Sequence, residues 1–314
     1  MRPTLLLAGL CSIIPSARLP DRPGCVVASL RPCVSASLRP SVQAPPGTDV
    51  YVAPLKRSGG TLTVGEPVNV TARPGYDNQP FFSPDGKSLY FTSVRGGQSD
   101  IYRHDFGTRA TRQVTNTPES EYSPTVTPDG KHLSVVRVER DSTQRLWAFT
   151  LDGVAVKPIL DSIKPVGYHA WLNADTVFVF VLGSPATLRR AELAHGTAEI
   201  VARDIGRGVF RIPGRRAISY VQRDSAGGTI RSLDPVTSAS TELIRLPEGT
   251  EFYAWTPDGE ILSARGNELL RWRQGDRGWS PVASFPEAGL RKISRIAVSG
   301  AGDRIALVGE EPAP

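Results

Sequence analysis

Five oxygen-bearing side chains lie just before short apolar segments or at their starts, where they could hold a metal ion. They are Asp77, Asn78, Glu119, Glu121 and Glu251. Carboxylate and amide oxygens are the ligands that calcium prefers, and a bound metal could activate water for hydrolysis. Acidic residues beside turns are more often solvated loop residues. We therefore expect a protein with no catalytic residue and no cofactor, and keep a metal-dependent hydrolase as the alternative.

A second set of side chains suits recognition. Arginine and tyrosine are enriched at protein interfaces, because both combine a flat apolar surface with hydrogen-bond donors. Arginines, tyrosines and two of the acids above flank the turns around the apolar segments, at Tyr76, Asp77, Arg95, Glu121, Tyr122, Arg140, Arg223 and Arg265. We predict that these residues bind a protein or peptide partner. Arginine favours an anionic segment, because its planar fork matches a carboxylate.

Other catalytic signatures are missing from the sequence. It has no Gly-x-Ser-x-Gly elbow of a serine hydrolase and no His-Glu-x-x-His zinc motif. Gly86-Lys87-Ser88 imitates the end of a phosphate-binding loop, but Phe81 stands where that loop needs its first glycine. These absences favour a binding protein over an enzyme.

An internal repeat spaces these residues along the chain. The tripeptide Pro-Asp-Gly recurs between apolar runs, at residues 84–86, 128–130 and 257–259. Degenerate copies fill the gaps at Ala174, Pro213 and Ala301, so that successive intervals are 44, 46, 39, 44 and 44 residues. Proline presets φ, aspartate bonds the backbone ahead of it and glycine accepts a positive φ, so each copy predicts a hairpin. A period of this length is typical of four-stranded propeller blades.

The first copy resembles the TolB-like β-propeller repeat, a relative of the WD repeat. The resemblance rests on residues 82–87 (FSPDGK) and 100–102 (DIY), and the second and fifth copies match at the turn. It extends over residues 48–314 and implies an all-β, six-bladed propeller that acts as a binding scaffold in the cell envelope. We expect no α/β domain of the kind that precedes the propeller in TolB, so TolB's own role in envelope assembly is not carried over.

The last blade is predicted to be completed from the other end of the chain. Only six residues follow Val308, so the sixth copy itself can supply only two strands. Residues 48–55 resemble a third strand and residues 65–71 a fourth. Residues 48–71 are therefore expected to close the ring, which leaves no long unpaired strand edge.

In such a ring the inner strands begin at one rim, and the loops between second and third strands lie on the same rim. The predicted arginines and tyrosines should therefore surround one mouth of the central channel. His169 is the histidine expected near that mouth, as a polar rim residue and not as a metal ligand.

Residues 1–47 are predicted to be a signal-like segment followed by a disordered linker. Residues 5–14 form an apolar run behind Arg2, as in a short secretory signal. Two similar octapeptides at 28–35 and 36–43 form a Pro-rich repeat with interspersed arginines, as in a linker that cannot bury a core. A misassigned start codon is the alternative. Export predicts a periplasmic or secreted protein, and all three cysteines lie in this part of the chain.

The distribution of charge argues against nucleic-acid binding. The chain carries 37 basic and 31 acidic side chains, a net charge of +6. Five arginines and one aspartate lie in residues 1–47, which leaves a net charge of +2 on residues 48–314, whereas phosphate binding needs a concentrated basic face. No apolar run reaches the ~20 residues that span a bilayer. We expect a monomer with a protein or peptide partner, no nucleic acid and no membrane-spanning segment.

Overall fold

The computed structural model describes residues 47–286 and 289–311. Within these ranges the chain forms 25 β-strands and no helix, so no helix in the described part could cross a membrane. The predictions for the signal-like segment and linker concern residues that lie almost entirely outside these ranges.

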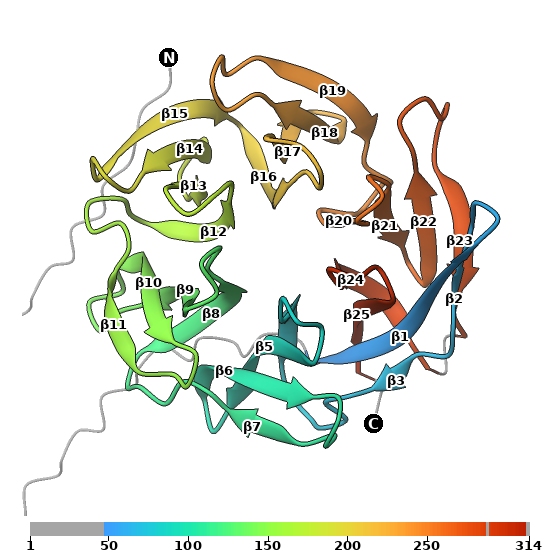
Figure 1. The fold of residues 1–314 in the computed structure, drawn as a ribbon, viewed down its shortest axis with the longest axis horizontal. Coiled ribbons are helices and arrows are strands. Elements are labelled where there is room, and N and C mark those ends of the chain that lie inside the picture. Colours follow the sequence, from blue (N-terminus) through green and yellow to red (C-terminus); the bar gives the residue numbers. More distant parts are fainter. Residues whose placement is uncertain (1–46, 287–288, 312–314) are drawn as a thin grey trace, which may run out of the picture. The chain divides into compact units, whose positions relative to one another are not determined.

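The strands form six sheets arranged as blades around a central axis (Figure 1). Blade 1 comprises β4 (Asp77–Phe82), β5 (Ser88–Arg95), β6 (Gln98–Asp105) and β7 (Thr111–Gln113). Blade 2 comprises β8 (Ser120–Val126), β9 (His132–Val138), β10 (Gln144–Thr150) and β11 (Ala155–Pro158). Blade 3 comprises β12 (Val166–Trp171), β13 (Thr176–Val181), β14 (Thr187–Glu192) and β15 (Thr197–Arg203).

The other three blades follow the same plan. Blade 4 comprises β16 (Ile205–Arg211), β17 (Ile218–Asp224), β18 (Gly227–Leu233) and β19 (Ser240–Arg245). Blade 5 comprises β20 (Tyr253–Trp255), β21 (Ile261–Arg265), β22 (Glu268–Trp272) and β23 (Ser280–Ser284). Blade 6 combines β24 (Arg291–Val298) and β25 (Arg304–Glu310) with β1 (Thr48–Ser58), β2 (Thr61–Val64) and β3 (Val68–Asn69). The prediction of an all-β, six-bladed propeller closed by N-terminal strands is confirmed.

The repeated turn works as its residue types require. In blade 1 the Asp85 carboxylate accepts hydrogen bonds from the Ser83 hydroxyl (2.6 Å) and from the Lys87 backbone N–H (3.0 Å). Gly86 has a φ of +67°, a conformation that costs glycine little. The same bonds recur around Asp129 in blade 2. The turn aligns the inner strand with the second strand in each of these blades.

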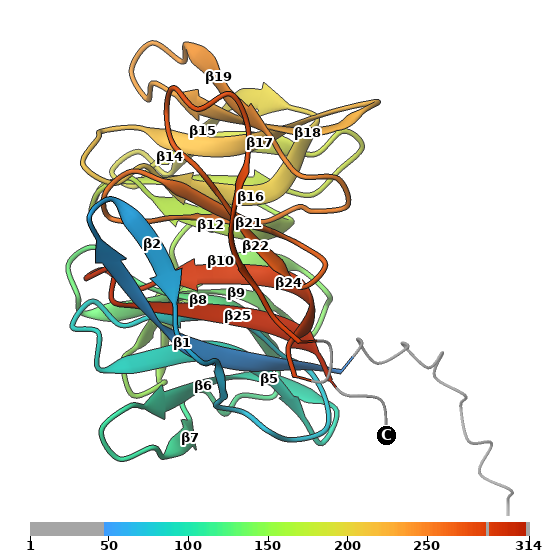
Figure 2. The same ribbon diagram turned by 90° about the vertical axis from the view of Figure 1, so that its right-hand side faces the viewer.

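The ring closes through β1, which pairs with β25 in an antiparallel register from Thr48 opposite Glu310 to Pro54 opposite Arg304. The side view shows the two strands lying alongside each other (Figure 2). The outer strand differs from the expected single segment over residues 65–71, because it consists of β2 and β3, which both pair with β1. Two glycines with positive φ, Gly59 and Gly60, turn the chain back early, and Pro67, between β2 and β3, has no N–H to donate.

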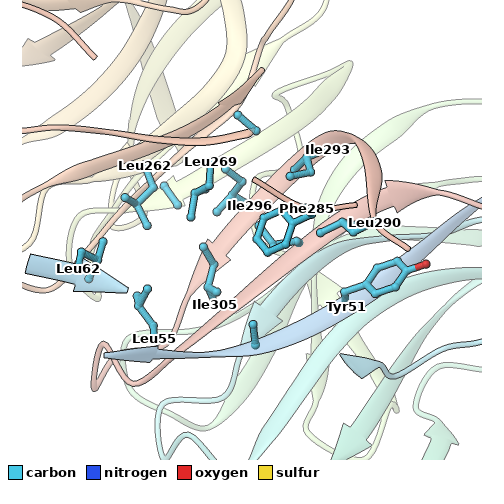
Figure 3. Close-up of a cluster of buried hydrophobic side chains, with 14 residues drawn as sticks. Tyr51, Leu55, Leu62, Leu262, Leu269, Phe285, Leu290, Ile293, Ile296 and Ile305 are labelled. Atoms are coloured by element: carbon cyan, nitrogen blue, oxygen red, sulfur yellow. The ribbon is translucent and has the colours of Figure 1, made fainter. Parts of the chain in front are cut away.

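A buried apolar cluster joins the closing strands to their neighbours (Figure 3). Leu55 of β1 and Leu62 of β2 are 3% and 6% exposed. They belong to the same cluster as Leu262 and Leu269 of blade 5 and Ile305 of β25. The N-terminal strands are therefore part of the core between blades 5 and 6.

Candidate binding site at one end of the channel

The inner strands β4, β8, β12, β16, β20 and β24 all begin at the same end of the ring, here called the entry rim. In an antiparallel blade the loop from the second to the third strand returns to this rim. Arg95 and Arg265 end second strands, Arg223 is the next-to-last residue of one, and Arg140 lies in such a loop. The topology thus distributes the four arginines over blades 1, 2, 4 and 5 of the entry rim.

Each of the four arginines has a partner within the protein. Arg140 Nε lies 3.3 Å from a carboxylate oxygen of Glu119, and Arg265 Nη2 lies 2.9 Å from one of Glu268. Arg223 forms an ion pair with Glu251. The Arg95 guanidinium instead stacks 3.9 Å from the ring centre of Tyr102. Three of the four arginines therefore have an acidic partner, and the positive potential of the rim is weaker than the arginines alone suggest.

The two acids predicted for the site, Asp77 and Glu121, are fully buried. Asp77 forms a 3.0 Å ion pair with Arg73, and the Arg137 Nε lies 3.4 Å from Glu121. Burial raises the pKa of Asp77 and raises the pKa of Glu121 to about 7. Both carboxyl groups lie beneath the entry rim and have no access to solvent.

The acids considered as metal ligands are paired with arginines. Glu119 pairs with Arg137 and Arg140, and Glu251 lies between Arg207 and Arg223. Among the residues that the structure describes, no group of three or more histidine, cysteine or acidic side chains is placed to hold a metal ion.

A cluster inside the channel was not foreseen from the sequence. Its members come from five inner strands or the residues just before them, and are Gln79, Tyr168, Arg207, Phe252 and Arg295, here called the entrance cluster. The register explains why three of them meet. Tyr168, Phe252 and Arg295 each lie three residues before the last paired residue of an inner strand, and so stand at one level around the axis.

Arg295 is the centre of this cluster. Its guanidinium carbon lies 3.8 Å from the ring centre of Phe252 and 5.2 Å from that of Tyr168. The Nη2 of Arg295 donates a 3.2 Å hydrogen bond to the Tyr168 hydroxyl. The rings of Tyr168 and Phe252 meet edge to face with centres 6.0 Å apart. Two aromatic rings thus hold the guanidinium in place by cation–π contacts.

The two predicted tyrosines have different surroundings. Burial raises the pKa of Tyr76 to about 12, although the charges of Arg295 and Arg207 act in the opposite direction. Tyr122 lines the same groove as Tyr168 and Arg207. Of the two predicted tyrosines, Tyr122 thus shares a groove with members of the entrance cluster, and the arginines of the cluster were not predicted.

Two hollows meet at the entrance cluster. The channel cavity has a volume of about 430 Å³, and its walls include Phe81, Phe210 and Trp255. The rim groove, about 480 Å³, crosses blades 2 to 4 and is lined by apolar residues such as Phe180 and Leu182. Gln79, Tyr168 and Arg207 line both hollows.

Arg207 and Arg295 were missed because they lie in the degenerate blades 4 and 6, where the turn motif is weak. The available signal was positional: each arginine precedes a degenerate turn by a distance that an inner-strand residue should have. His169, expected at the rim, is instead buried between blades. Its Nε2 lies 2.7 Å from the Ser134 hydroxyl of blade 2, and burial lowers the pKa of His169 to about 3.

The described strands form a six-bladed β-propeller with a hollow at its axis. Residues 44–164 match the TolB beta propeller domain family. The matched residues contain strands β1 to β11, and the remaining described strands continue the same propeller fold.

Known proteins resemble parts of this sequence or share its fold. An uncharacterized protein of Agrobacterium fabrum is 27% identical over 104 residues, which cover 31% of this chain and 36% of that relative. A solved protein from Agrobacterium tumefaciens, designated TolB, superposes with a TM-score of 0.66 at 15% identity, over 86% of this chain and 100% of that one.

Two further solved structures share the fold. TolB from Acinetobacter baumannii has a TM-score of 0.55 at 17% identity, over 84% of this chain and 64% of that one. An oligogalacturonate lyase in complex with manganese has a TM-score of 0.56 at 16% identity, over 80% of this chain and 82% of that one. At these identities the likeness concerns the fold.

Proposed function

We propose that this TolB-like propeller binds an extended segment of a protein or peptide at the entry rim and catalyses no reaction. The observation that carries the proposal is the meeting of the channel cavity and the rim groove at Gln79, Tyr168 and Arg207. Binding sites are typically concave and mostly apolar, with a few convergent polar groups, and the channel cavity has that composition. A segment lying in the groove would insert one end into the channel.

The predicted rim residues would contribute in different ways. Tyr122 and Arg223 line the rim groove and would contact the segment directly. Arg95, Arg140 and Arg265 would attract an anionic partner from a distance, an effect that acts mainly on the association rate.

The two buried acids would act indirectly. Asp77 and Glu121 would hold Arg73 and Arg137 in place beneath the rim and would not touch the partner. We therefore assign to them a supporting role in the site.

The cellular setting is also part of the proposal. The apolar run at residues 5–14 and the resemblance to TolB support a periplasmic or secreted protein. The small net charge of residues 48–314 supports a partner other than nucleic acid. Because the chain closes its ring with its own strands, a monomer is sufficient to form the site.

Two substitutions in blade 3 test the proposal. Leu182 lines the rim groove and is 42% exposed, whereas Ile200 is 41% exposed on the outer strand β15. Peptides would be selected from a phage-displayed library on the purified protein and their affinities measured by fluorescence anisotropy. We expect Leu182→Asp to weaken binding at least about tenfold, since it introduces a charge into an apolar contact, and Ile200→Asp to leave it unchanged. Equal binding by both variants would refute the proposed groove.

The competing function is a metal-dependent hydrolase, because the fold is shared with a lyase that was solved with manganese. That hypothesis requires carboxylates such as Glu119 and Glu251 to leave their arginine partners and coordinate a metal. It predicts a stoichiometric metal ion in protein purified without chelator, measured by plasma mass spectrometry. The binding function predicts substoichiometric metal and unchanged peptide affinity after dialysis against EDTA.

A further inference from the structure

We infer that the entrance cluster binds one carboxylate of the peptide segment at Arg295, with an apolar side chain of the same segment in the channel cavity. The inference deepens the proposed function and rests on it, because it names the chemical group that the channel end of the segment must carry.

The charge of Arg295 is the first observation. Among residues 47–286 and 289–311, no carboxylate oxygen lies within 4.0 Å of its guanidinium, although the side chain is half-buried in the channel. By contrast, the neighbouring Arg207 lies 3.7 Å from Glu251. A partly desolvated cation normally has an anionic partner, since removing a charge from water is costly. The entrance cluster therefore has an uncompensated positive charge facing a cavity.

The geometry of the guanidinium is the second observation. Phe252 covers the guanidinium 3.8 Å from its ring centre, and one N–H donates to Tyr168. An arginine has five N–H donors, and the described residues accept only this one hydrogen bond from Arg295. None of its nitrogens is among the buried atoms without a partner, so the free donors are open to solvent in the cavity. A planar fork held by aromatic rings is suited to a planar carboxylate.

The residues that line the cavity around Arg295 favour one kind of side chain next to the bound carboxylate. Below the entrance cluster the channel cavity is bounded by Phe81, Val209, Phe210, Ala254 and Trp255. These walls offer little hydration to a second charge or a polar side chain. They favour one large apolar side chain next to the carboxylate.

A carboxylate next to an apolar side chain has two sources in a peptide. It is either the α-carboxylate of a chain that ends in an apolar residue or an acidic side chain beside such a residue. Three synthetic probes distinguish them: acetyl-Ser-Val-Leu-Phe with a free carboxylate, the same peptide as its C-terminal amide, and acetyl-Ser-Val-Glu-Phe-amide.

Affinities for the probes would be measured by calorimetry on the full chain and on three variants. We expect at least one carboxylate probe to bind the natural protein about tenfold or more tightly than acetyl-Ser-Val-Leu-Phe-amide. Arg295→Gln should reduce that affinity to the level of the uncharged amide, and Arg295→Lys should restore part of it, because lysine keeps the charge without the fork. Arg112→Gln removes an exposed charge on the outer strand β7 and should leave the affinities for all three probes unchanged. Thermal melting of each variant would show that it is folded.

The outcomes separate the two proposals. Preference for the free acid identifies a chain terminus, and preference for the glutamate probe identifies an acidic side chain; both support the inference. Equal affinity for the carboxylate probes and the amide, with binding still lost in Leu182→Asp, would overturn the carboxylate site and leave the groove intact. Selected peptides that bind equally well to Leu182→Asp and Ile200→Asp would overturn the proposed function itself. A carboxylate preference that persists in folded Arg295→Gln would refute the assignment to Arg295.

Discussion

Replacing Leu55 with alanine tests whether the N-terminal strand β1 closes the ring. Leu55 is 3% exposed and packs in the cluster that joins blades 5 and 6 (Figure 3). The next residue, Lys56, is exposed to solvent. The two positions are adjacent in β1, so they form a matched pair in which only one side chain contributes to the core.

The expected loss follows from what the substitution removes. Leu→Ala deletes roughly three methylene equivalents, each worth about 0.8 kcal/mol on burial, or about 2.4 kcal/mol in total. The cavity that remains adds to this, and such substitutions in cores cost about 2–5 kcal/mol. Leu62, Leu262 and Ile305 surround the site from three strands, so collapse into the cavity would have to move several strands together. We therefore expect about 3 kcal/mol or more for Leu55→Ala.

Urea denaturation followed by tryptophan fluorescence measures this loss. Lys56→Ala should change the free energy of unfolding by no more than about 0.5 kcal/mol. If residues 48–58 were a tether outside the ring, both variants would be nearly neutral. A loss below about 1 kcal/mol for Leu55→Ala, or equal losses for the two variants, would refute the closing role of β1.

Three further outcomes follow from the structure. Gly86→Val should lower the free energy of unfolding by about 1–3 kcal/mol, because φ is +67° there. Asp85→Ala should lower it by about 1 kcal/mol, because it removes the turn hydrogen bonds. Thermal melting would rank the two variants, and a larger loss for Asp85→Ala would contradict this explanation of the turn. Because burial raises the pKa of Glu121 from 4.5 to about 7, the folded state retains a proton that the unfolded chain loses, so stability falls as pH rises through this window. Glu121→Gln should reduce the difference in unfolding free energy between about pH 5 and pH 8 by up to about 3 kcal/mol, and an unchanged pH profile would assign the fall to other groups. Arg57→Ala should lower stability by about 1–3 kcal/mol, because Arg57 of β1 holds the buried Glu260 of blade 5; an unchanged melting temperature would show that this ion pair does not help to close the ring.

The repeat could be recognised from the sequence because the chemistry of a turn is local. Proline, aspartate and glycine act within a few residues of each other, as the Asp85 hydrogen bonds show. The outer strand of blade 6 was placed less well, since its position depends on the Gly59-Gly60 turn, which replaces the repeated motif there. Degenerate copies keep the period but lose the residue types, so strand ends near them could not be fixed from the sequence.

The sequence by itself determined the blade, the number of blades and the origin of the closing strands, because each depends on residues close together or on a regular interval. It also determined which rim carries the arginines, since topology follows from strand order. Only the tertiary structure decided which of these arginines have acidic partners. Arg140, Arg223 and Arg265 pair with acids, whereas Arg95 and Arg295 stack on aromatic rings. Tyr168 and Arg295 are 127 residues apart in the chain and meet only when the ring closes, and no local pattern records that contact.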